Sequence, residues 1–483
     1  MKTYDAAILG AGPAGCCAAL RLAGLGHRVA LIERARFPRP QVGESLSPGI
    51  GNLLDYLGLA PLPEAVGFIQ GLPGQIAWNT PAPRPWPSEQ RGSVLMVDRA
   101  RFDAWLLGAA RARGVDVLQP ARLAAGAVDA DGWRLAIRQA EGVLAVRARL
   151  LLDTTGRNGH RPYRHHATAA PTLALCARVE AGAFPWETRI EALADGWVWG
   201  SPHPDGAYRV MAFVDGATPA RIRPAERFAC LLRRSRLFGA AAAARIAVRP
   251  ATAYCDAEPW SLGRIKLGEA AFALDPLSSS GVEKAMRFAL QAAVAANTLL
   301  REPASAGLAR DFYESRLAQA VAAHRRWAAD YYASAHWADG QPFWQARARP
   351  REFPGGADES AWIGRLRQAL GQPAAGLAEK PAPPPLDVDA AWAKPVALCP
   401  SLRIVHVPCV VDDRVRLRAA AAHPGLGQPV AFLAGTELVP LLDAVRGAGS
   451  LAQLVGLWSA AMPPPAAARL AGWLLNHGVL RLS

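Results

Sequence analysis

A glycine-rich segment near the start of the chain has the residue types that bind a diphosphate. Residues 10–15 read Gly-Ala-Gly-Pro-Ala-Gly and directly follow the largely apolar run 4–9. In this spacing the first glycine permits a tight turn, the second lets backbone amides approach a diphosphate, and the third lets a helix pack closely on a strand. The amides and positive dipole end of that helix would then face the phosphates. The predicted contacts in this segment are Gly10, Gly12, Pro13, Ala14 and Gly15.

The elements around this segment are those that a dinucleotide site requires. The apolar run 4–9 is typical of a buried strand, 16–25 is an alanine-rich helix, and 29–32 is a second buried strand. Glu33 follows that second strand with the spacing needed to accept hydrogen bonds from ribose hydroxyls. A glycine turn by itself can be an ordinary connection, so this context is what predicts a Rossmann unit.

Other catalytic constellations are weak in this sequence. We find no convincing Ser/His/Asp set, carboxylate pair or His/Cys cluster with the spacing of metal ligands, so no metal is expected. The adjacent pair His165 and His166 is read as part of a loop rather than as ligands. Seven cysteines stand at irregular positions without a Cys-x-x-Cys pair, and we expect them to be reduced and structural.

Four further segments resemble motifs of the flavin-dependent halogenase, geranylgeranyl reductase and aromatic hydroxylase superfamily. Residues 41–49 resemble its Gly-Glu-Ser segment beside the flavin ring, and 97–103 resemble its Arg-x-x-Phe-Asp helix start, whose arginine reaches the flavin. Residues 151–157 resemble its Asp-Ala-Thr-Gly-Arg element, and 265–282 its segment along the ribityl chain and pyrimidine edge. The resemblance covers about residues 1–340 and implies noncovalently bound FAD. The further FAD contacts that it implies are Glu33, Arg34, Glu44, Ser45, Arg99, Gly268, Glu269, Pro276, Gly281 and Val282.

Two details of the last segment bear on the cofactor. Glu269 stands where the superfamily has aspartate, so an extra methylene must be accommodated at the ribityl contact. Residues 280–282 precede a long helix expected at 283–300, and free amides there would stabilise negative charge on a reduced flavin. An ordinary serine cap of that helix is the alternative interpretation.

The kind of flavin chemistry depends on a tryptophan motif and on lysine. Residues 196–202, Gly-Trp-Val-Trp-Gly-Ser-Pro, resemble the halogenase Trp-x-Trp-x-Ile-Pro motif with Ser201 in place of isoleucine. A halogenase also needs a lysine amine, and no lysine occurs between Lys2 and Lys266. The resemblance without that lysine implies a monooxygenase, in which an electron-rich ring attacks the distal oxygen of a flavin C4a-hydroperoxide formed from O₂.

Three residues are candidates for the catalytic site. Trp197 and Trp199 alternate on an expected strand and therefore share one face. They are either core residues or a wall of the substrate cavity. Glu44, in the segment beside the flavin ring, is the third candidate, and no catalytic acid or base can be assigned.

Charge and hydropathy restrict the partners. The net charge is +14, but the arginines are scattered and form no basic tract, so an acidic protein partner or plain solubility explains the charge better than nucleic acid. No signal-peptide pattern opens the chain, and no apolar run approaches the roughly 20 residues that span a bilayer. We therefore expect a cytoplasmic protein that is not inserted in a membrane.

The predicted fold class is α/β, with a glutathione-reductase-type Rossmann FAD-binding domain, an antiparallel-sheet substrate domain and a small C-terminal winged-helix-like domain. Proline, arginine and glycine are frequent in the segment that precedes the C-terminal domain, which is typical of a linker. The expected boundaries are 1–165 for the FAD-binding domain, with inserted strands at about 45–98 belonging to the substrate domain, 166–260 for the substrate sheet, 261–340 for the FAD-binding return segment and long helices, 341–395 for the Pro-rich linker and 396–483 for the small C-terminal domain.

The C-terminal segment resembles winged-helix units that recognise peptides in modified-peptide biosynthesis. A DNA-binding wing fits less well, because the last 50 residues contain three arginines and no lysine. A purely stabilising domain is an equal alternative to peptide recognition.

Together these features are similar to the FAD-dependent tryptophan monooxygenases that mature the quinone-bearing small subunit of quinohemoprotein amine dehydrogenase. That resemblance implies hydroxylation, in two steps, of a tryptophan in a partner polypeptide, with O₂ as co-substrate. NAD(P)H or a reduced partner would supply electrons, and a complex with other maturation enzymes is expected. The alternatives are a small-molecule aromatic hydroxylase or halogenase-like enzyme, a geranylgeranyl-type reductase and a non-enzymatic flavin-bound adaptor.

Overall fold

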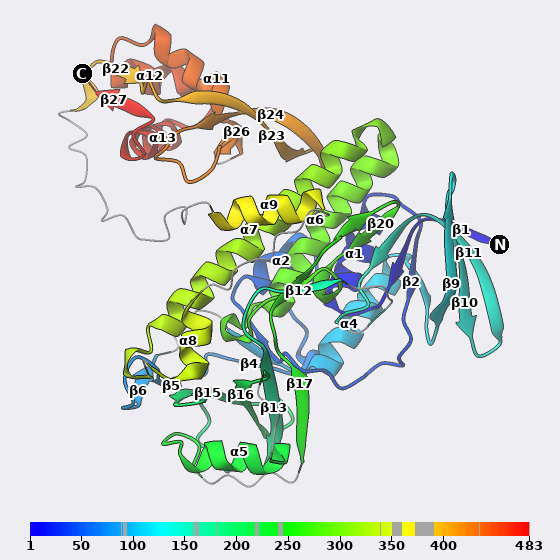
Figure 1. The fold of residues 1–483 in the computed structure, drawn as a ribbon. Helices are drawn as coiled ribbons and strands as arrows, with labels where there is room; N and C mark the ends of the chain where they lie inside the picture. Colours follow the sequence, from blue (N-terminus) through cyan, green and yellow to red (C-terminus); the bar gives the residue numbers. More distant parts are fainter. Residues whose placement is uncertain are drawn as a thin grey trace. The chain divides into compact units, whose positions relative to one another are not determined.

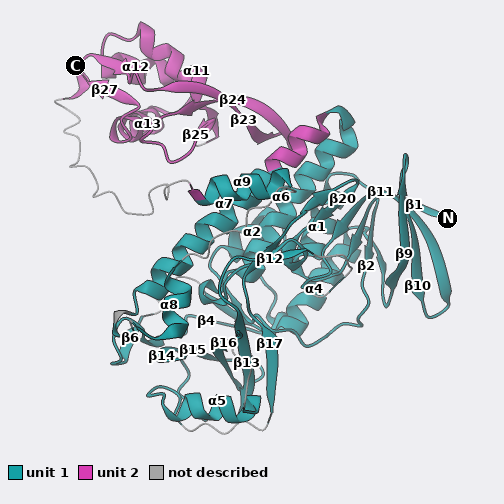
Figure 2. Cartoon of the chain, viewed as in Figure 1, with its two compact units in different colours: residues 1–304, 313–370 teal, residues 305–312, 371–483 magenta. Residues whose placement is uncertain are grey.

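The computed structural model divides the chain into two compact units, each described here by itself (Figure 2). Unit 1 comprises residues 1–304 and 313–370, and unit 2 comprises 305–312 and 371–483. The proline run 381–385 of the expected linker lies outside the described residues. The structure describes residues 1–87, 89, 94–157, 159, 164–180, 182–217, 222–239, 245–338, 340–349, 360–371, 391–433 and 435–482.

The first sheet of unit 1 has a parallel centre in the order β20-β11-β1-β2-β8. Its central strands are buried on both faces, so they read in the sequence as continuous apolar runs. β9 and β10 extend β11 on the antiparallel side as a small meander. These strands are β1 (Lys2–Leu9), β2 (Val29–Ile32), β8 (Asp116–Leu118), β9 (Arg122–Asp129), β10 (Gly132–Gln139), β11 (Gly142–Asp153), β19 (Trp260–Ser261) and β20 (Arg264–Lys266).

Helices close the nucleotide side of this sheet (Figure 1). α1 (Pro13–Gly24) packs against α4 (Arg99–Ala112) and α6 (Gly281–Arg301). Small side chains on α1 allow this close approach, and the Cys17 thiol reaches the Met286 carbonyl of α6 at 3.4 Å. The strand, turn and helix arrangement confirms the predicted Rossmann fold.

The second sheet of unit 1 runs β17-β13-β16-β15-β14-β5-β6 and is antiparallel except where β14 meets β5. One face packs on α5 (Pro224–Arg233) and the other on a cluster of aromatic side chains, so every residue of β15 is buried. The strands are β5 (Gly74–Ala77), β6 (Arg84–Trp86), β13 (Thr172–Val179), β14 (Thr188–Leu193), β15 (Gly196–Pro202), β16 (Tyr208–Asp215) and β17 (Ile246–Pro250).

The remaining elements of unit 1 connect the two sheets. His165 and His166 lie in a short strand, β12, rather than in the expected loop, because β12 pairs with β18 and His165 stacks on Tyr254 with ring centroids 4.0 Å apart. These elements are β3 (Ser45–Leu46), β4 (Phe68–Gln70), β7 (Leu95–Val97), β12 (His165–Ala167), β18 (Tyr254–Asp256), β21 (Phe272–Ala273), α2 (Ile50–Tyr56), α7 (Ala306–Ala333), α8 (Pro342–Ala348) and α9 (Ala361–Gly371), of which α7 begins within unit 2.

Unit 2 has a hydrophobic core of its own, to which three helices contribute. The second half of β24 is alanine-rich and lacks the alternation typical of a strand. The elements are β22 (Val396–Leu398), β23 (Arg403–Val411), β24 (Arg414–Ala422), β25 (Phe432–Leu433), β26 (Thr436–Glu437), α11 (Leu438–Asp443), α12 (Leu451–Trp458), α13 (Pro464–Asn476) and β27 (Leu480–Leu482).

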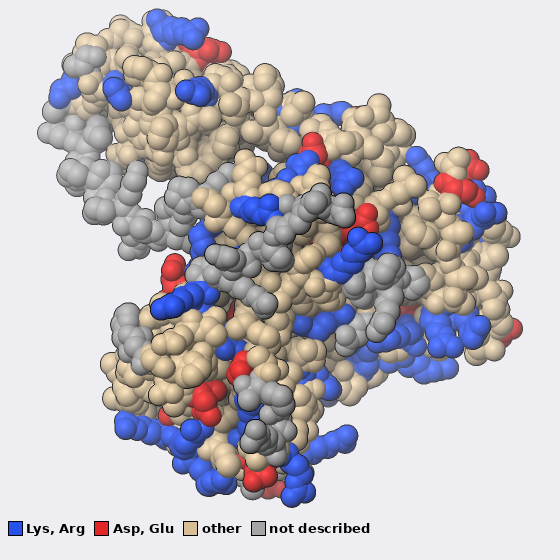
Figure 3. Space-filling view, in the orientation of Figure 1, with Lys and Arg blue, Asp and Glu red and all other residues tan. Residues whose placement is uncertain are grey.

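No helix within the described ranges is both long and apolar enough to cross a membrane. On the face drawn in Figure 3, lysine and arginine side chains are spread over the surface with acidic side chains among them.

Candidate cofactor and substrate site

The glycine turn between β1 and α1 accepts no larger residues at its tightest points. Gly10 has a φ of +100°, and a Cβ there would lie 2.6 Å from the Thr154 carbonyl oxygen. A Cβ on Gly15 would lie 1.9 Å from the Gly10 carbonyl oxygen. No described side chain caps α1 at Gly12, and Pro13 stands at its first turn, so the first amides of α1 remain free for an anion. The geometry fits the diphosphate of a dinucleotide.

Glu33 lies beside this turn, at the end of β2. Its carboxylate accepts hydrogen bonds from the backbone N–H groups of Ala11 at 2.7 Å and Ala35 at 2.8 Å. An ionised carboxylate has about four acceptor positions, so two remain for ribose hydroxyls. The neighbouring Arg34 is exposed to solvent.

The return segment reaches the same turn from the distant part of the chain. Gly268 has a φ of +60°, and a Cβ there would lie 3.0 Å from the Cβ of Ala14. The side chain of Glu269 points outward, 51% exposed, with its Oε1 3.4 Å from Arg157 Nη2. The longer side chain at this position is thus accommodated in an ion pair with the arginine of the 151–157 motif.

A second cluster joins the 41–49 segment to the start of α6. A Cβ on Gly43, whose φ is +96°, would lie 2.8 Å from Arg99 Nη1 and 3.9 Å from Val282 Cγ2. Ser47 Oγ donates to Glu283 Oε2 at 2.5 Å, while Ser45 opens β3. Residues that are more than two hundred positions apart in the sequence therefore meet here.

Arg99 holds this loop in place. Its Nε and Nη2 donate to Asp103 at 3.0 and 3.2 Å, and its Nη1 donates to the carbonyls of Val42 at 2.8 Å and Gly43 at 3.1 Å. Four of the five guanidinium N–H groups are thereby engaged. The structure gives Arg99 a positioning role toward the loop, whereas the resemblance implied contact with the flavin.

Glu44 brings an unpredicted arginine into this cluster. Its Oε2 accepts from the Gly43 N–H at 2.9 Å, and its Oε1 lies 3.7 Å from Nε of Arg209 on β16. The Nη1 of Arg209 is buried and makes no hydrogen bond to any described residue. A buried donor without a partner is costly, so this group fits an acceptor atom of a bound molecule. The signal in the sequence was a single charge within an apolar strand.

The N-terminus of α6 is open in the way an anion site requires. Pro276 begins a short 3-10 turn, and α6 starts at Gly281 and Val282. The Ser280 side chain does not cap the helix but hydrogen bonds to Ser278 Oγ at 2.7 Å. The ordinary serine cap considered as an alternative is therefore absent, and the first amides of α6 are available.

Trp197 and Trp199 do not join these clusters. They are 2% and 8% exposed and belong to the aromatic cluster between the second sheet and helices α7 and α8. Trp197 stacks on Phe213 with ring centroids 3.9 Å apart. Of the two interpretations, packed core is the one the structure favours.

A series of buried hydrogen bonds links that core to the loop before α6. Trp197 Nε1 donates to the Tyr332 hydroxyl at 3.2 Å, and this hydroxyl donates to Asp275 Oδ1 at 3.1 Å. The Asp275 amide donates to His324 Nε2 at 3.0 Å. Burial raises the pKa of Asp275 above its usual range, raises that of Tyr332 well above it, and lowers the pKa of His324 to about 4. Such shifted groups gather at functional sites.

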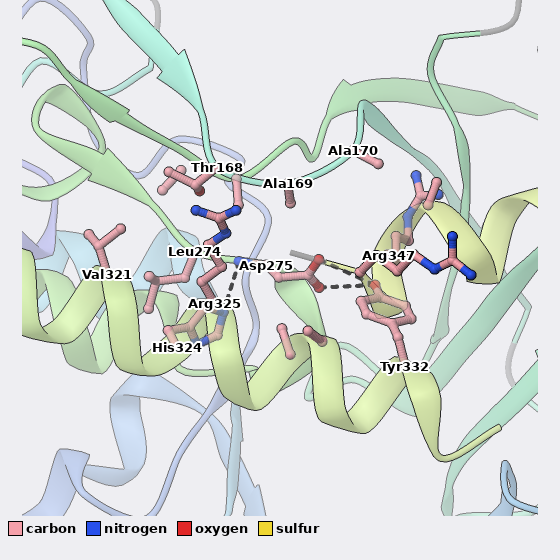
Figure 4. Close-up of a pocket in the computed structure, with 16 residues that line it drawn as sticks. Thr168, Ala169, Ala170, Leu274, Asp275, Val321, His324, Arg325, Tyr332 and Arg347 are labelled. Atoms are coloured by element: carbon pink, nitrogen blue, oxygen red, sulfur yellow. Dashed lines mark hydrogen bonds between the residues drawn. The ribbon is translucent and has the colours of Figure 1, made fainter. Parts of the chain in front are cut away.

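These groups border a small pocket that is partly open to solvent (Figure 4). Figure 4 shows the Asp275 carboxylate and the Tyr332 hydroxyl pointing toward one another, with His324 on the same helix as Tyr332. Much of the wall is formed by alanines 169, 170, 253, 273, 328, 329 and 346. The pocket adjoins the loop that the sequence predicts along the flavin.

Lys266, the first lysine after Lys2, is committed to a structural contact. Its Nζ lies 2.6 Å from Asp256 Oδ1, and both side chains are almost completely buried. A lysine held in this pair is not available to direct a halogenating species.

Comparisons with known proteins agree with this geometry. The FAD binding domain family matches residues 3–169. The chain is 27% identical over 336 residues to tryptophan 2-halogenase of Chondromyces crocatus, covering 64% of this chain and 63% of the relative. The solved structure of the peptidyl tryptophan dihydroxylase QhpG, described as essential for tryptophylquinone cofactor biogenesis, matches with a TM-score of 0.73 at 26% identity over 99% of both chains. The chain is therefore similar to flavin-dependent halogenases and to this dihydroxylase.

Further similar proteins limit what can be concluded about the activity. A 163-residue match at 30% identity to digeranylgeranylglycerophospholipid reductase of Thermoplasma volcanium covers 32% of this chain and 40% of the relative. The halogenase CmlS, with a TM-score of 0.72 at 22% identity and coverage of 100% and 96%, shares the fold. The chain spans less than two thirds of the length of these curated relatives. It is an FAD-dependent protein of the oxidoreductase type.

Proposed function

We propose that this chain hydroxylates a tryptophan side chain of a partner polypeptide, in two successive reactions, during formation of a tryptophylquinone cofactor. The observation that carries this proposal is the match to a peptidyl tryptophan dihydroxylase along 99% of both chains, which includes unit 2. The net charge of +14 suits an acidic partner. A cytoplasmic location and a complex with other maturation enzymes are parts of the same proposal.

The chemistry of this proposal places few demands on side chains. Reduced FAD, when bound, supplies two electrons to O₂, drawn from NAD(P)H or a reduced partner. One oxygen atom joins a ring carbon in place of hydrogen, and the other leaves as water with two protons. The chain's residues must orient the indole and exclude bulk water, and the small apolar walls around Asp275 and Tyr332 are suited to that task.

Tryptophan halogenation is the second candidate, because a tryptophan 2-halogenase is among the relatives. The buried ion pair of Lys266 counts against it. Lys284, near the start of α6, is the lysine of unit 1 that could take the directing role instead.

The test is a single turnover of the holoenzyme. The FAD is photoreduced under nitrogen and mixed with oxygenated buffer containing chloride, bromide and a tryptophan-bearing acceptor protein. We expect the acceptor to gain one and then two oxygen atoms on tryptophan, and an acceptor with phenylalanine at that position to gain none.

A halogen mass on the acceptor would instead establish the halogenase reading, with Lys284→Met as the variant to examine next. A small-molecule hydroxylase would oxidise free indoles and ignore the acceptor. A reductase would consume no O₂ with its substrate, and an adaptor would be indifferent to reduction of its flavin.

A further inference from the structure

The pocket beside Asp275 has more positive than negative charge. Three of its lining residues are arginines, Arg325 on α7, Arg347 on α8 and Arg349 directly after α8, and Asp275 is the single acidic residue among them. Figure 4 shows Arg325 on one side of the pocket and Arg347 on the other, with Asp275 between them.

Two of these three cations lack a counter-ion among the described residues. Arg325 and Arg349 make no hydrogen bond or ion pair to another described residue, and Arg325 Nε is buried without a partner. The side chain of Arg347 is 1% exposed, and its Nη2 donates to Pro171 O and Thr172 Oγ1, both at 2.7 Å. Its Nε is nevertheless buried without a partner, and the nearest carboxylate, that of Asp215, is 3.8 Å away.

Asp275 does little to offset this charge. Its carboxylate already accepts hydrogen bonds from the Tyr332 hydroxyl and from the Leu277 N–H. Burial raises its pKa, so a second anion entering the pocket meets less repulsion than a fully ionised aspartate would impose.

Arg325 is partly buried and its Nε has no partner, which is costly, while Arg349 is exposed on the same pocket. A planar carboxylate is the anion that the N–H groups of a guanidinium match best. We propose that this pocket binds the carboxylate of an aspartate or glutamate that lies close to the target tryptophan in the partner polypeptide, with Arg325 and Arg349 as the recognising residues. This inference rests on the proposed function and adds the sequence context of its substrate.

The experiment measures binding without turnover. Two tryptophan-containing peptides that differ by glutamate or glutamine beside the tryptophan are titrated into the oxidised holoenzyme by calorimetry. We expect the glutamate peptide to bind about tenfold more tightly, as one charge-assisted guanidinium contact would give. Arg325→Gln and Arg349→Gln should each reduce that preference to about twofold or less while leaving the affinity for the glutamine peptide unchanged.

Arg223→Gln is the matched control, because Arg223 is exposed at the N-terminus of α5 and is not among the pocket residues. Equal affinity of the wild-type enzyme for both peptides would overturn the inference, as would an equal loss of preference in Arg223→Gln. A preference for glutamate in an enzyme that never oxidises the peptide would support the pocket and refute the proposed function, so the two failures are distinguishable.

Discussion

At the scale of single residues, the site depends on a chain of buried polar contacts. Trp197 donates to Tyr332, and Tyr332 donates to Asp275 at the beginning of the loop that leads to α6. Each of these groups is buried, so each hydrogen bond replaces one to water and cannot be lost cheaply. This series of hydrogen bonds couples the tryptophan motif of the second sheet to the loop predicted to contact FAD.

Replacement of Tyr332 by phenylalanine should therefore destabilise unit 1 by about 1–3 kcal/mol, because Trp197 loses its acceptor and Asp275 loses a donor. Urea unfolding, followed by protein fluorescence, gives this free energy. Tyr331→Phe is the control, since no hydrogen bond of the Tyr331 hydroxyl to a described residue is observed. Similar losses in both variants would show that bulk aromatic packing, not the polar chain, matters here.

His324 should make stability depend on pH. Burial lowers its pKa to about 4, so the folded state disfavours the charged form. The folded state therefore has its full stability above the unfolded-state pKa of about 6.5. It loses stability, by at most about 3 kcal/mol, as the pH falls toward about 4. His324→Gln keeps an acceptor for the Asp275 amide but does not titrate.

The measurement is the unfolding free energy of wild type minus that of His324→Gln across this pH window. Asp275 has a raised pKa and acts in the opposite direction, since its protonation at low pH recovers stability, but it is present in both proteins and largely cancels. A flat difference between the two proteins would contradict the assignment.

At the scale of elements, the cofactor site is the meeting point of helix termini and turns from distant segments. The first turns of α1 and α6 both lack a side-chain cap, and Gly268 and Gly43 bring the return segment and the 41–49 loop into contact with them. Backbone amides at such termini attract negative charge without any charged side chain. This explains why the site is rich in glycine.

Gly15→Ala should prevent FAD binding, because its Cβ would lie 1.9 Å from the Gly10 carbonyl oxygen and would force the turn open. The measurement is the ratio of bound flavin to protein after purification. Gly24→Ala, at the end of the same helix, is the control, since nothing lies within 4 Å of its Cβ position and alanine favours a helix. Full flavin content in Gly15→Ala would rule out the assigned turn.

At the scale of the whole molecule, two units have separate hydrophobic cores. The core of unit 2 is formed by residues between 391 and 480, and Trp458 at its centre donates its indole N–H to the Leu441 carbonyl at 2.8 Å. Damage to this core should therefore leave the flavin site of unit 1 intact.

Trp458→Ala should lower the free energy of unfolding of unit 2 by about 3–5 kcal/mol, since it leaves a large cavity. Calorimetry should show one thermal transition shifted down and another unchanged, with the flavin content preserved. Leu457→Ala, at a 51% exposed neighbouring position, should leave both transitions in place. Loss of flavin in Trp458→Ala would instead mean that the units fold as one.

Local patterns made much of this fold and part of its site predictable. The glycine turn and Glu33 lie together as expected, because adjacent residues in a strand, turn and helix have few alternative arrangements. The interpretation of Trp197 and Trp199 stayed open, since period-two aromatics give the same pattern in a core as in a cavity wall. Arg209, Arg347 and Arg349 were missed because no short motif contains them.

The sequence by itself determined the Rossmann unit, the need for glycine at its turn and the absence of lysine between Lys2 and Lys266. These features depend on residues that are close together in the sequence, or on composition. The tertiary structure alone decided that Arg99 holds the 42–43 loop, that Lys266 is engaged by Asp256 and that Asp275 faces Tyr332 in a pocket lined by arginines. Such facts depend on which side chains meet after distant segments pack, and burial then sets their charge and hydrogen bonding.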